Sequence, residues 1–337
     1  MKVRLLYLGN QLSKHGLNTT TIETLGPDLE RLGFEVVYAS SKKGFVFRLL
    51  DMLGAILMHR KKLSYILIDT YSTKAFWYAF LAAQLAQFLK INYIPILHGG
   101  NLPNRLKNNP KLSRRLFSNA YRNVAPSGYL KQVFEAEGFT NVVLIPNAIA
   151  IEKYTFKNRI NLAPKLLWVR TFASIYHPEM AIRLLQQLQK TYSEATLTMV
   201  GPDKDGSMQT TKALAASLEL PVTFPGQLSK EAWWQLAAEH DIFINTTHFD
   251  NTPVSVLEAM ALGLPVVSTA VGGIPYLITP DVTGKLVPDA DTDAMVAGIT
   301  ELLQQPEQGQ LLIQNARSFV AQMDWDVVKE KWVEVFK

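Results

Sequence analysis

The sequence predicts an α/β protein built from two doubly wound domains that face one another across a deep cleft. Three observations lead to this prediction. The chain has 337 residues, which is longer than most single domains. Short β-rich runs alternate with helix-length stretches over most of that length. The alternation pauses at a polar, proline-capped segment, residues 147–164, and then starts again. Two successive series of this kind are typical of two parallel sheets covered by helices.

The elements of each series follow in order along the chain. The first series has the apolar runs VRLLYL, EVVYA, YILID, YIPIL, NVAP and VVLIP, separated by helical patterns such as TIETLGPDLERLG and SGYLKQVFEAEG. The second series has KLLWVR, TLTMVG, VTFPG, DIFIN, PVVST and KLVP. We therefore expect one domain over residues 1–160 and a second over 161–315. A final amphipathic helix over 316–337 is expected to pack back across the first domain.

Composition is that of a globular protein. Hydrophobic residues make up 48% of the chain and charged residues 19%, which excludes a disordered or fibrous class. The absence of cysteine excludes disulfides and thiolate metal sites and fits a cytoplasmic, reducing compartment. The N-terminal MKVRLLYLGN has only a short apolar run, so it is interpreted as a first strand and not as a signal peptide.

Charge is divided unevenly between the predicted domains. Residues 1–160 hold 22 Lys and Arg against 9 Asp and Glu, a net charge of +13, whereas the rest of the chain carries −8. A basic first domain suits an anionic membrane surface or a phosphate-bearing acceptor. A solvated surface is the alternative, because clusters of like charge are common there. Nucleic acid is not expected as a partner, since no recognised binding motif accompanies the charge.

Polar side chains and glycines follow several predicted strands. Arg170 follows KLLWV, His98 follows YIPIL, and HFDNTPVSVLEAMA comes soon after DIFIN. Gly272 and Gly273 come shortly after PVVST. In an open α/β sheet, ligands bind outside the carboxyl ends of the strands. We therefore expect these residues to lie along a ligand site.

The segment HFDNTPVSVLEAMA places a predicted helix start between two carboxylates, Asp250 and Glu258. Thr252 is a good N-cap, and the proline after it suits a first helical turn. The backbone amides of Val254 and Ser255 would then point out of the helix start, where a phosphate group is favoured.

Glu258 lies on a helix that is otherwise apolar on almost every side, which predicts that the helix is buried. A buried carboxylate without a partner would cost several kcal/mol or be neutralised. The hydroxyl groups of a ligand are one candidate partner. An internal salt bridge with a Lys or Arg is the other, and the sequence leaves both open.

The stretch FDNTPVSVLEAMALGLPVVSTAVGGIPYLI resembles the donor-site signature of the family 4 retaining glycosyltransferases (glycosyl transferases group 1), which have the GT-B fold. The signature is a carboxylate, seven residues, a glutamate, and then EAMA.G.PVV.T..GG.P. Asp250 stands where the family more often has Glu. Other family landmarks occur in order over nearly the whole chain, namely ILHGGNLP, APSGYL, LIPNAI, LLWVR, MVGPD, FPGQLSKEAWWQLAAEHDIFIN and VTGKLVP.

The resemblance implies a role for each matching residue of the second domain. Glu258 would accept hydrogen bonds from the ribose hydroxyls of a nucleotide, and Asp250 would contact hydroxyls of the donor sugar. Arg170 would hold the diphosphate together with the amides of Val254 and Ser255, stabilising charge on the leaving group.

Three further positions complete the implied site. Leu228, which follows FPGQ, would lie against the base. His98 and Gly16 come from the first domain and would close on the sugar and the diphosphate. A satisfied loop histidine is the alternative interpretation of His98, because histidine has an intermediate burial preference.

Two positions depart from the family pattern. The family usually has a Lys several residues after the Arg, and in RTFASIYHPEMAI the matching residue is His177. A nearby phosphate would raise the pKa of His177, so the strength of the diphosphate clamp would depend on pH. The first-domain glycine loop, commonly Gly-Gly in the family, is KHGLNTTT here and keeps only Gly16.

The family retains anomeric configuration, but no carboxylate here is clearly placed as a nucleophile. The resemblance implies front-face attack through an oxocarbenium-like ion pair as the alternative, with the departing phosphate helping to deprotonate the acceptor, and we favour it. No cofactor or metal is expected. The pairs DKD, DAD and DWD suit a divalent ion, but they fall where Asp is a common helix cap, and Arg170 supplies the positive charge.

The resemblance implies transfer of a sugar from a UDP-, GDP- or ADP-sugar to a saccharide or lipid-linked acceptor, in cell-surface polysaccharide or glycan biosynthesis. A nucleotide-sugar epimerase of the same fold is one alternative, although no acid/base pair is identified for it. A non-catalytic nucleotide-sugar-binding subunit is another, although Arg170 and Asp250 are both present. A Rossmann oxidoreductase is not expected, because LYLGNQLSKHG lacks the G-x-G-x-x-G pattern.

Overall fold

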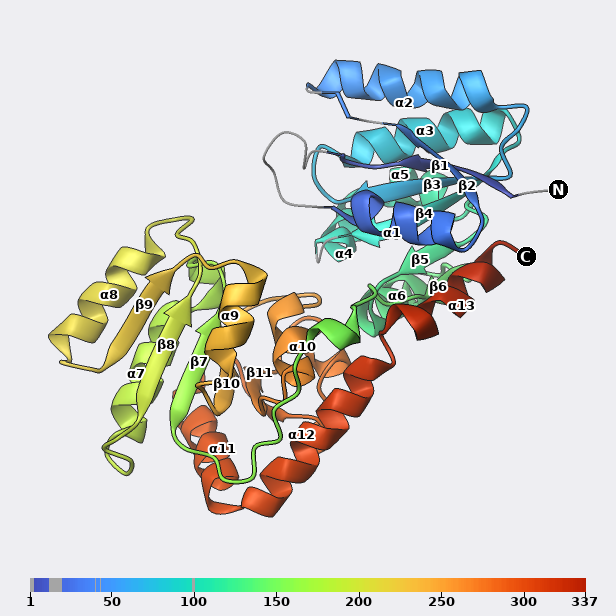
Figure 1. Ribbon diagram of the computed structural model, residues 1–337. Coiled ribbons are helices and arrows are strands. Elements are labelled where there is room, and N and C mark those ends of the chain that lie inside the picture. The colour runs from blue at the N-terminus through green and yellow to red at the C-terminus, as the bar shows by residue number, and fades with distance from the viewer. Residues whose placement is uncertain (1–2, 12–19, 40, 43, 99–100) are drawn as a thin grey trace. The chain divides into compact units, whose positions relative to one another are not determined.

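The computed structural model describes residues 3–11, 20–39, 41–42, 44–98 and 101–337. The chain divides into two compact units (Figure 1). Unit 1 is Met1–Asn147 with Asp326–Lys337, and unit 2 is Ala148–Trp325. Each unit contains a six-stranded sheet in which all the described strand pairs are parallel. The two doubly wound domains predicted from the sequence are therefore confirmed.

The sheet of unit 1 has the order β2-β1-β3-β4-β5-β6. Because the chain passes from β1 to β2 on one side and then back to β3 on the other, the strand order reverses between β1 and β3. The strands are β1 (Arg4–Leu8), β2 (Glu35–Ala39), β3 (Tyr65–Tyr71), β4 (Asn92–His98), β5 (Asn123–Ala125) and β6 (Val142–Leu144). The helices are α1 (Thr21–Arg31), α2 (Phe45–His59), α3 (Phe76–Phe88), α4 (Leu102–Asn108), α5 (Pro110–Phe117) and α6 (Gly128–Ala136).

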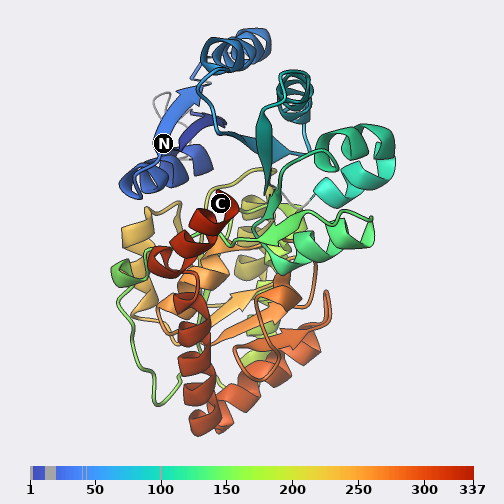
Figure 2. The same cartoon turned by 90° about the vertical axis from the view of Figure 1, so that its right-hand side faces the viewer.

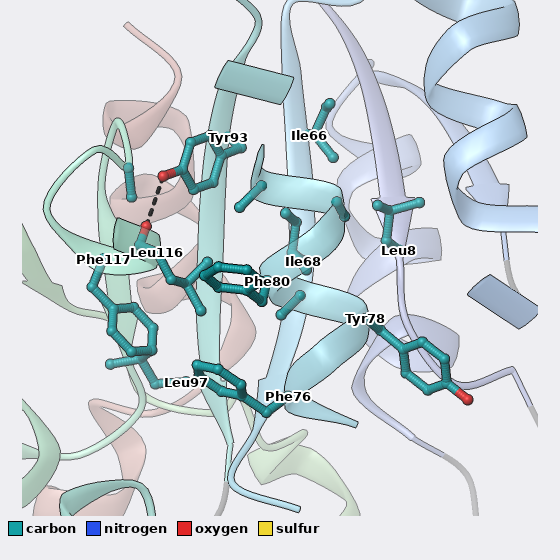
Figure 3. Packing of buried hydrophobic residues seen from close by; sticks show 14 of the residues in the cluster. Leu8, Ile66, Ile68, Phe76, Tyr78, Phe80, Tyr93, Leu97, Leu116 and Phe117 are labelled. Carbon is teal, nitrogen blue, oxygen red and sulfur yellow. Dashed lines mark hydrogen bonds between the residues drawn. The ribbon is translucent and has the colours of Figure 1, made fainter. Parts of the chain in front are cut away.

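The core of unit 1 forms between this sheet and its covering helices (Figure 3). Ile66 and Ile68 lie two positions apart on β3, so both point to the same face, where they meet the same buried cluster as Phe76 of α3. Tyr93 of β4 is buried in this cluster, and its hydroxyl donates a 2.6 Å hydrogen bond to the carbonyl of Leu116. The polar end of the ring is therefore satisfied inside an otherwise apolar layer.

The sheet of unit 2 has the order β12-β11-β10-β7-β8-β9, so its order reverses between β7 and β10. The strands are β7 (Lys165–Val169), β8 (Thr196–Val200), β9 (Val222–Gly226), β10 (Ile242–Asn245), β11 (Val266–Thr269) and β12 (Lys285–Val287). The helices are η2 (Ile151–Lys153), η3 (Ser174–Tyr176), α7 (Pro178–Leu188), α8 (Ser207–Ser217), α9 (Lys230–Ala237), α10 (Val254–Ala261), η4 (Ile274–Tyr276), α11 (Thr292–Gln304) and α12 (Pro306–Ala321).

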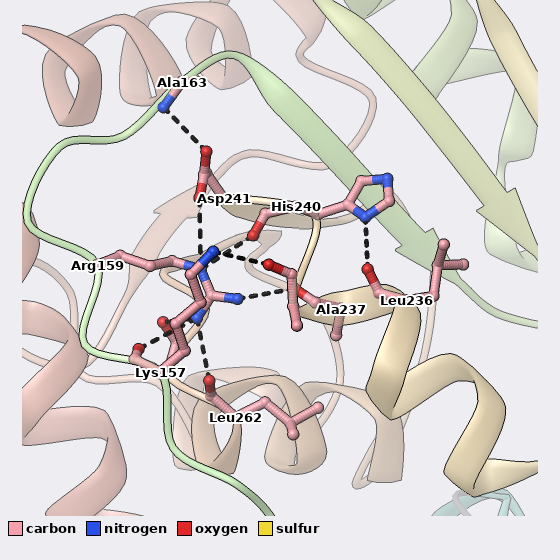
Figure 4. Close-up of polar contacts among 10 residues, drawn as sticks. Lys157, Arg159, Ala163, Leu236, Ala237, His240, Asp241 and Leu262 are labelled. Carbon is pink, nitrogen blue, oxygen red and sulfur yellow. Dashed lines mark hydrogen bonds and ion pairs between the residues drawn. The ribbon is translucent and has the colours of Figure 1, made fainter.

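The domain boundary expected after residue 160 is wrong, because residues 148–160 belong to unit 2. Arg159 fastens this segment to unit 2 (Figure 4). Its guanidinium donates to the main-chain carbonyls of Ala237 at 2.7 Å and His240 at 2.9 Å, and its Nε lies 3.6 Å from Asp241 Oδ1. Burial lowers the pKa of Arg159 to about 10, and Asp241 opposes this effect. The polar segment provides hydrogen-bond donors to main-chain carbonyls of unit 2, so it is part of that unit and not a free linker.

The helix expected over residues 316–337 is also corrected, because it is two helices (Figure 2). α12 runs from Pro306 to Ala321, and α13 (Trp325–Val335) follows after a short turn. In that turn the carboxylate of Asp324 accepts a 2.9 Å hydrogen bond from the amide of Ile151, which holds the turn to unit 2. Beyond it the chain joins unit 1, where the Phe336 ring lies 4.9 Å from that of Phe34.

Among the helices of the described residues, none is both long enough and apolar enough to pass through a lipid bilayer.

Candidate functional site

The candidate site of unit 2 lies at the carboxyl ends of β7 and β10, where the strand order reverses. Open α/β sheets bind ligands at such a switch point. Arg170 is the first residue beyond β7. The chain beyond β10 forms a loop over residues 246–253 and then enters α10. The rule that selected these residues from the sequence therefore places them at one edge of one sheet.

Arg170 and Asp250 form an ion pair between the two strand ends. Their side chains are 19% and 12% exposed, so the pair is largely withdrawn from solvent. Arg170 also lies over the ring of Tyr176, with its Cζ 4.3 Å from the ring centroid. Burial lowers the pKa of Arg170, and the Tyr176 hydroxyl opposes this effect. Arg170 Nε is buried and has no hydrogen-bond partner among the described residues. This N–H of the guanidinium therefore remains available as a hydrogen-bond donor.

The start of α10 differs by one residue from the sequence prediction. Pro253, and not Thr252, is the N-cap, because its backbone is extended at φ −65° and ψ 111° and its carbonyl accepts from Val256 at 3.1 Å. The amides of Val254 and Ser255 are the first two of the helix, as expected. The hydroxyl oxygens of Thr252 and Ser255 are buried and have no partner among the described residues. Polar atoms left in this state are suited to a polar ligand.

Glu258 is 3% exposed and lies one turn beyond the start of α10. Its Oε1 accepts a 3.1 Å hydrogen bond from the Tyr154 hydroxyl and lies 3.1 Å from Lys230 Nζ. Burial raises the pKa of Glu258, although Lys230 and Tyr154 both lower it. The internal salt bridge left open by the sequence is therefore present. Both contacts fall on Oε1, so Oε2 has no protein partner among the described residues.

His177 is the N-cap of α7 and has a left-handed backbone, with φ 46° and ψ 57°. Its ring stacks on that of His248 with 4.3 Å between centroids, and His248 Nδ1 lies 2.8 Å from Asp289 Oδ1. Burial lowers the pKa of His177, and the neighbouring His248 lowers it further. His177 Nδ1 is buried without a partner in the described part of the chain. At neutral pH the ring is therefore uncharged and keeps one nitrogen available.

Gly272 and Gly273 hold the loop that carries Asp250. The amide of Gly273 donates a 2.8 Å hydrogen bond to the Asp250 carbonyl. A Cβ atom at Gly272 would collide with that carbonyl, and one at Gly273 would collide with the carbonyl of Asn251. Gly272 also has φ +56°, which disfavours other residues. The two loops therefore meet backbone to backbone.

Unit 1 has a second polar cluster at the carboxyl ends of β1, β3 and β4. His98, the last residue of β4, is 8% exposed, and its Nε2 lies 2.8 Å from Asp69 Oδ1. The Tyr7 hydroxyl of β1 donates to the same oxygen at 3.1 Å. The ring of Tyr71 stacks on His98 with 4.9 Å between centroids. Burial raises the pKa of Tyr7, and the Asp69 charge adds to this effect.

Gly9 follows β1 and lies against this cluster. A Cβ atom there would collide with Asp69 Oδ2, so only glycine leaves room for the carboxylate. Asp69 Oδ2 is itself buried without a partner among the described residues. His98 is thus a strand-end residue whose Nε2 is satisfied by a carboxylate, and its role in the site stays a prediction. Gly16, which the resemblance also placed in the site, lies outside the described residues.

Sequence reasoning missed several residues whose side chains contact the predicted ones, namely Asp69, Tyr71, Tyr154, Tyr176, Lys230 and His248. Asp69 had a usable signal, because it ends the run YILID as His98 follows YIPIL. Tyr154 had none, since it reaches Glu258 from 104 residues away. Leu228 lies in the loop between β9 and α9, half-buried against the core of unit 2.

The Asp-x-Asp pairs are used as caps and loop ties. Asp203 accepts from the amide of Gly206 at 3.0 Å, Asp205 from the amide of Ser174 at 2.8 Å, and Asp291 caps α11 through the Ala294 amide at 2.8 Å. The described residues contain no group of three or more His, Asp or Glu side chains placed to hold a metal ion. Metal independence stays a prediction.

Comparison with protein-family models matches residues 150–319 to the glycosyl transferases group 1 and residues 1–153 to glycosyltransferase family 4. The chain belongs to the group 1 glycosyl transferases of family 4. The first match contains every residue of the unit 2 site, and the second contains His98 and Asp69. The family resemblance found in the sequence is therefore confirmed.

Relatives of this glycosyl transferase chain match over part of their length. Sulfoquinovosyl transferase SQD2 of Arabidopsis thaliana is 29% identical over 156 residues, 45% of this chain and 30% of the relative. Glycogen synthase of Mycobacterium tuberculosis is 24% identical over 202 residues, 59% of this chain and 49% of the relative. The amylovoran biosynthesis glycosyltransferase AmsK of Erwinia amylovora is 35% identical over 130 residues, which are 37% of this chain and 31% of the relative. The matched segments thus span about a third to a half of these relatives.

Solved structures match over nearly the whole chain. Anabaena HepE in complex with UDP has a TM-score of 0.77 at 18% identity and covers 99% of both chains. Sucrose-phosphate synthase from Thermosynechococcus elongatus has a TM-score of 0.76 at 16% identity, covering 99% of this chain and 98% of the other. These similarities confirm the GT-B fold.

Proposed function

We propose that this chain transfers a sugar from a nucleotide diphosphate sugar to a saccharide or lipid-linked acceptor. One observation carries the proposal. Four buried polar atoms without protein partners among the described residues, Arg170 Nε, His177 Nδ1, Thr252 Oγ1 and Ser255 Oγ, belong to the carboxyl ends of β7 and β10 and to the helix starts beside them. A diphosphate would satisfy such a set, because helix amides and a guanidinium both favour an anion.

The rest of the donor would lie along α10. We assign the ribose hydroxyls to Glu258, whose Oε2 is free of protein contacts among the described residues while Oε1 is held by Tyr154 and Lys230. Asp250 would exchange part of its contact with Arg170 for hydroxyls of the donor sugar. Leu228 would pack against the base, and His98 with Gly16 would serve the sugar and diphosphate from unit 1.

We infer retention by front-face attack. In this step the bond between sugar C1 and the β-phosphate oxygen breaks, and the acceptor oxygen forms its bond to C1 on the same face. The acceptor proton passes to the departing phosphate. Arg170 and the amides of Val254 and Ser255 would stabilise the charge that develops on the leaving group. No metal ion enters this scheme, since a guanidinium can supply the positive charge.

The charge distribution supports a proposal for the acceptor and the site of action. Residues 1–160 carry +13, which supports a lipid-linked or phosphate-bearing acceptor at the cytoplasmic face of an anionic membrane, in polysaccharide or glycan biosynthesis. The relatives named above include an amylovoran biosynthesis glycosyltransferase, which supports the same setting.

The donor is tested by measuring nucleotide release from a panel of UDP-, GDP- and ADP-sugars, with and without added metal or chelator. We begin with UDP-glucose, because Anabaena HepE was solved with it. We expect one nucleotide series to bind and to be released as nucleoside diphosphate when an acceptor is supplied. An epimerase would instead interconvert sugars without net nucleotide release. Absence of binding to every member of the panel would refute the proposal.

A further inference from the structure

We propose that one face of α2 and α3 in unit 1 is a membrane-docking surface that enters the interface of an anionic lipid bilayer. We call it the α2 face and define it by the exposed residues Val46, Phe47, Leu50, Leu57 and Met58. The inference rests on the proposed function in one respect, the anionic membrane as partner. The surface itself does not depend on sugar transfer.

The α2 face is apolar where a surface helix is normally polar. Val46 is 61% exposed, Phe47 70%, Leu50 60%, Leu57 43% and Met58 79%. At 100° per residue these positions fall on one arc of the helix, which contains no charged residue within α2. The opposite arc is buried through Met52 and Ile56. A helix that packs one apolar arc on a core usually turns charged side chains to water.

α3 extends this apolar surface. α2 and α3 lie beside each other on the same side of the sheet (Figure 1, Figure 2). Trp77, Leu81 and Phe88 of α3 are 42%, 36% and 82% exposed, and their spacing places them on one side of that helix. Exposed apolar side chains gathered on two packed helices are typical of an interaction surface on a globular protein.

Basic side chains border the α2 face. Residues 41–91 contain eight Lys and Arg but only two acidic residues, Asp51 on α2 beside the apolar arc and Asp69, which is buried in the His98 cluster. At the end of α2, Arg4 and residues 57–62 line a surface hollow of about 420 Å³. Lys61 and Lys62 in this hollow have no ion-pair partner among the described residues. The hollow joins two apolar side chains to several cations, which suits the boundary between acyl chains and anionic headgroups.

The charge around the α2 face favours a lipid bilayer over a second copy of this chain as the partner that covers it. A two-fold interface would bring the same basic border opposite itself, where like charges repel. An anionic bilayer offers apolar depth and negative charge together. α2 has 15 residues and is therefore about 22 Å long, a length suited to lying in the interface plane.

A matched pair of variants tests the surface by vesicle flotation. Leu50→Asp places a charge on the α2 face, and Leu311→Asp does the same on α12 of unit 2, where the leucine is 59% exposed. On vesicles of phosphatidylcholine with phosphatidylglycerol, we expect the full chain to bind at low salt. Leu50→Asp should weaken binding by about tenfold or more, and Leu311→Asp should leave it unchanged. Replacing Lys61 and Lys62 with Ala should weaken it by about 30-fold.

Insertion is separated from charge adsorption by a fluorescent label. Because the chain has no cysteine, Leu50→Cys and Leu311→Cys each give one labelling site for an environment-sensitive dye. We expect a blue shift and stronger emission from the dye at residue 50 on anionic vesicles, and no change from the dye at residue 311.

Any one of three results with vesicles would overturn the inference. These are no vesicle binding at low salt, equal binding of Leu50→Asp and the unchanged chain, and a dye at residue 50 that stays in water on bound protein. A dimer in solution that Leu50→Asp dissociates would also overturn it, since the face would then join two copies. Vesicle binding is measured without donor, so this inference and the proposed donor specificity fail separately.

Discussion

Asp69 of β3 and His98, the last residue of the neighbouring strand β4, face each other with 2.8 Å between Oδ1 and Nε2. Both side chains are buried, and the Tyr7 hydroxyl holds the same carboxylate oxygen. A carboxylate oxygen can only accept a hydrogen bond, so Nε2 of His98 is the donor to Asp69. The ring orientation of His98 is therefore set in advance within unit 1.

Asp69→Asn tests this arrangement. The amide keeps the size of the carboxylate beside Gly9 but removes the charge that orients His98. We expect transfer at saturating donor to fall by about 10- to 100-fold, which corresponds to a lost hydrogen bond to a charged group. Asp293→Asn, at an exposed carboxylate of α11, is the control and should be silent. Full transfer activity in a folded Asp69→Asn protein would show that transfer does not require Asp69 to orient His98.

Glu258→Gln should separate stability from binding. Burial raises the pKa of Glu258 in the folded chain above its usual 4.5, so between those values the folded state binds more protons than the unfolded state. The stability contribution of this group is present at low pH and is lost as pH rises through the folded pKa. Glu258→Gln should flatten that part of the stability curve and weaken nucleotide binding by about tenfold or more. Chemical unfolding from pH 4 to 8 and calorimetry with nucleotide measure the two effects. Unchanged nucleotide affinity would exclude the ribose assignment.

Arg170→Ala should abolish transfer and also lower stability, because Asp250 would lose its buried partner. Breaking such a pair typically costs about 3–5 kcal/mol, and partial exposure places the expected loss below that range. Adding Asp250→Asn should recover much of the unfolding temperature without recovering transfer. If the double variant regained transfer, the diphosphate role of Arg170 would be wrong.

Donor affinity should rise as pH falls, through His177. Burial keeps its pKa below 6.5 in the free chain, so the ring is neutral at pH 7. A bound diphosphate favours the protonated ring, and binding then takes up a proton. Donor titrations from pH 5.5 to 8, in buffers of different ionisation enthalpy, measure that uptake. His177→Asn tolerates the left-handed backbone and should remove the pH dependence. If the pH dependence of donor affinity persists in His177→Asn, the proton taken up on binding is held by another group and the prediction is wrong.

Gly272→Ala should destabilise unit 2 by about 1–3 kcal/mol, since the added methyl meets the Asp250 carbonyl and the backbone is left-handed. Gly54→Ala, on α2 with nothing near its Cβ position, is the matched control and should stabilise by about 0.5–1 kcal/mol. Thermal unfolding measures both. Equal unfolding temperatures for the two variants would contradict the close contact.

The two sheets, and the position of Arg170 and Asp250 at one edge of the unit 2 sheet, could be predicted from the sequence because both follow from local patterns. Buried parallel strands are apolar runs, and the residue after each run must lie at the ligand edge, which located Arg170 and His98. The contacts that could not be predicted from the sequence join segments that are far apart along the chain. Tyr154 meets Glu258, and Arg159 meets the carbonyls of Ala237 and His240, only after distant segments fold together. No periodicity reports such a contact.

Two smaller errors have local causes. Thr252 has the right chemistry for a cap, but the fixed φ of Pro253 combines with an extended ψ, so the helix begins one residue later. The C-terminal pattern was interpreted as one helix because its apolar spacing continues through the turn that Asp324 holds.

The backbone contact between residues 250–251 and 272–273 limits how this protein can change. Inserting or deleting a residue in either loop would separate two main chains that touch without side chains between them. With the donor site proposed above, we expect changes in donor choice to arise from substitutions around a loop pair of fixed length. An engineer who seeks a different nucleotide sugar should vary Leu228, His177 or His248 and leave both loops their present lengths.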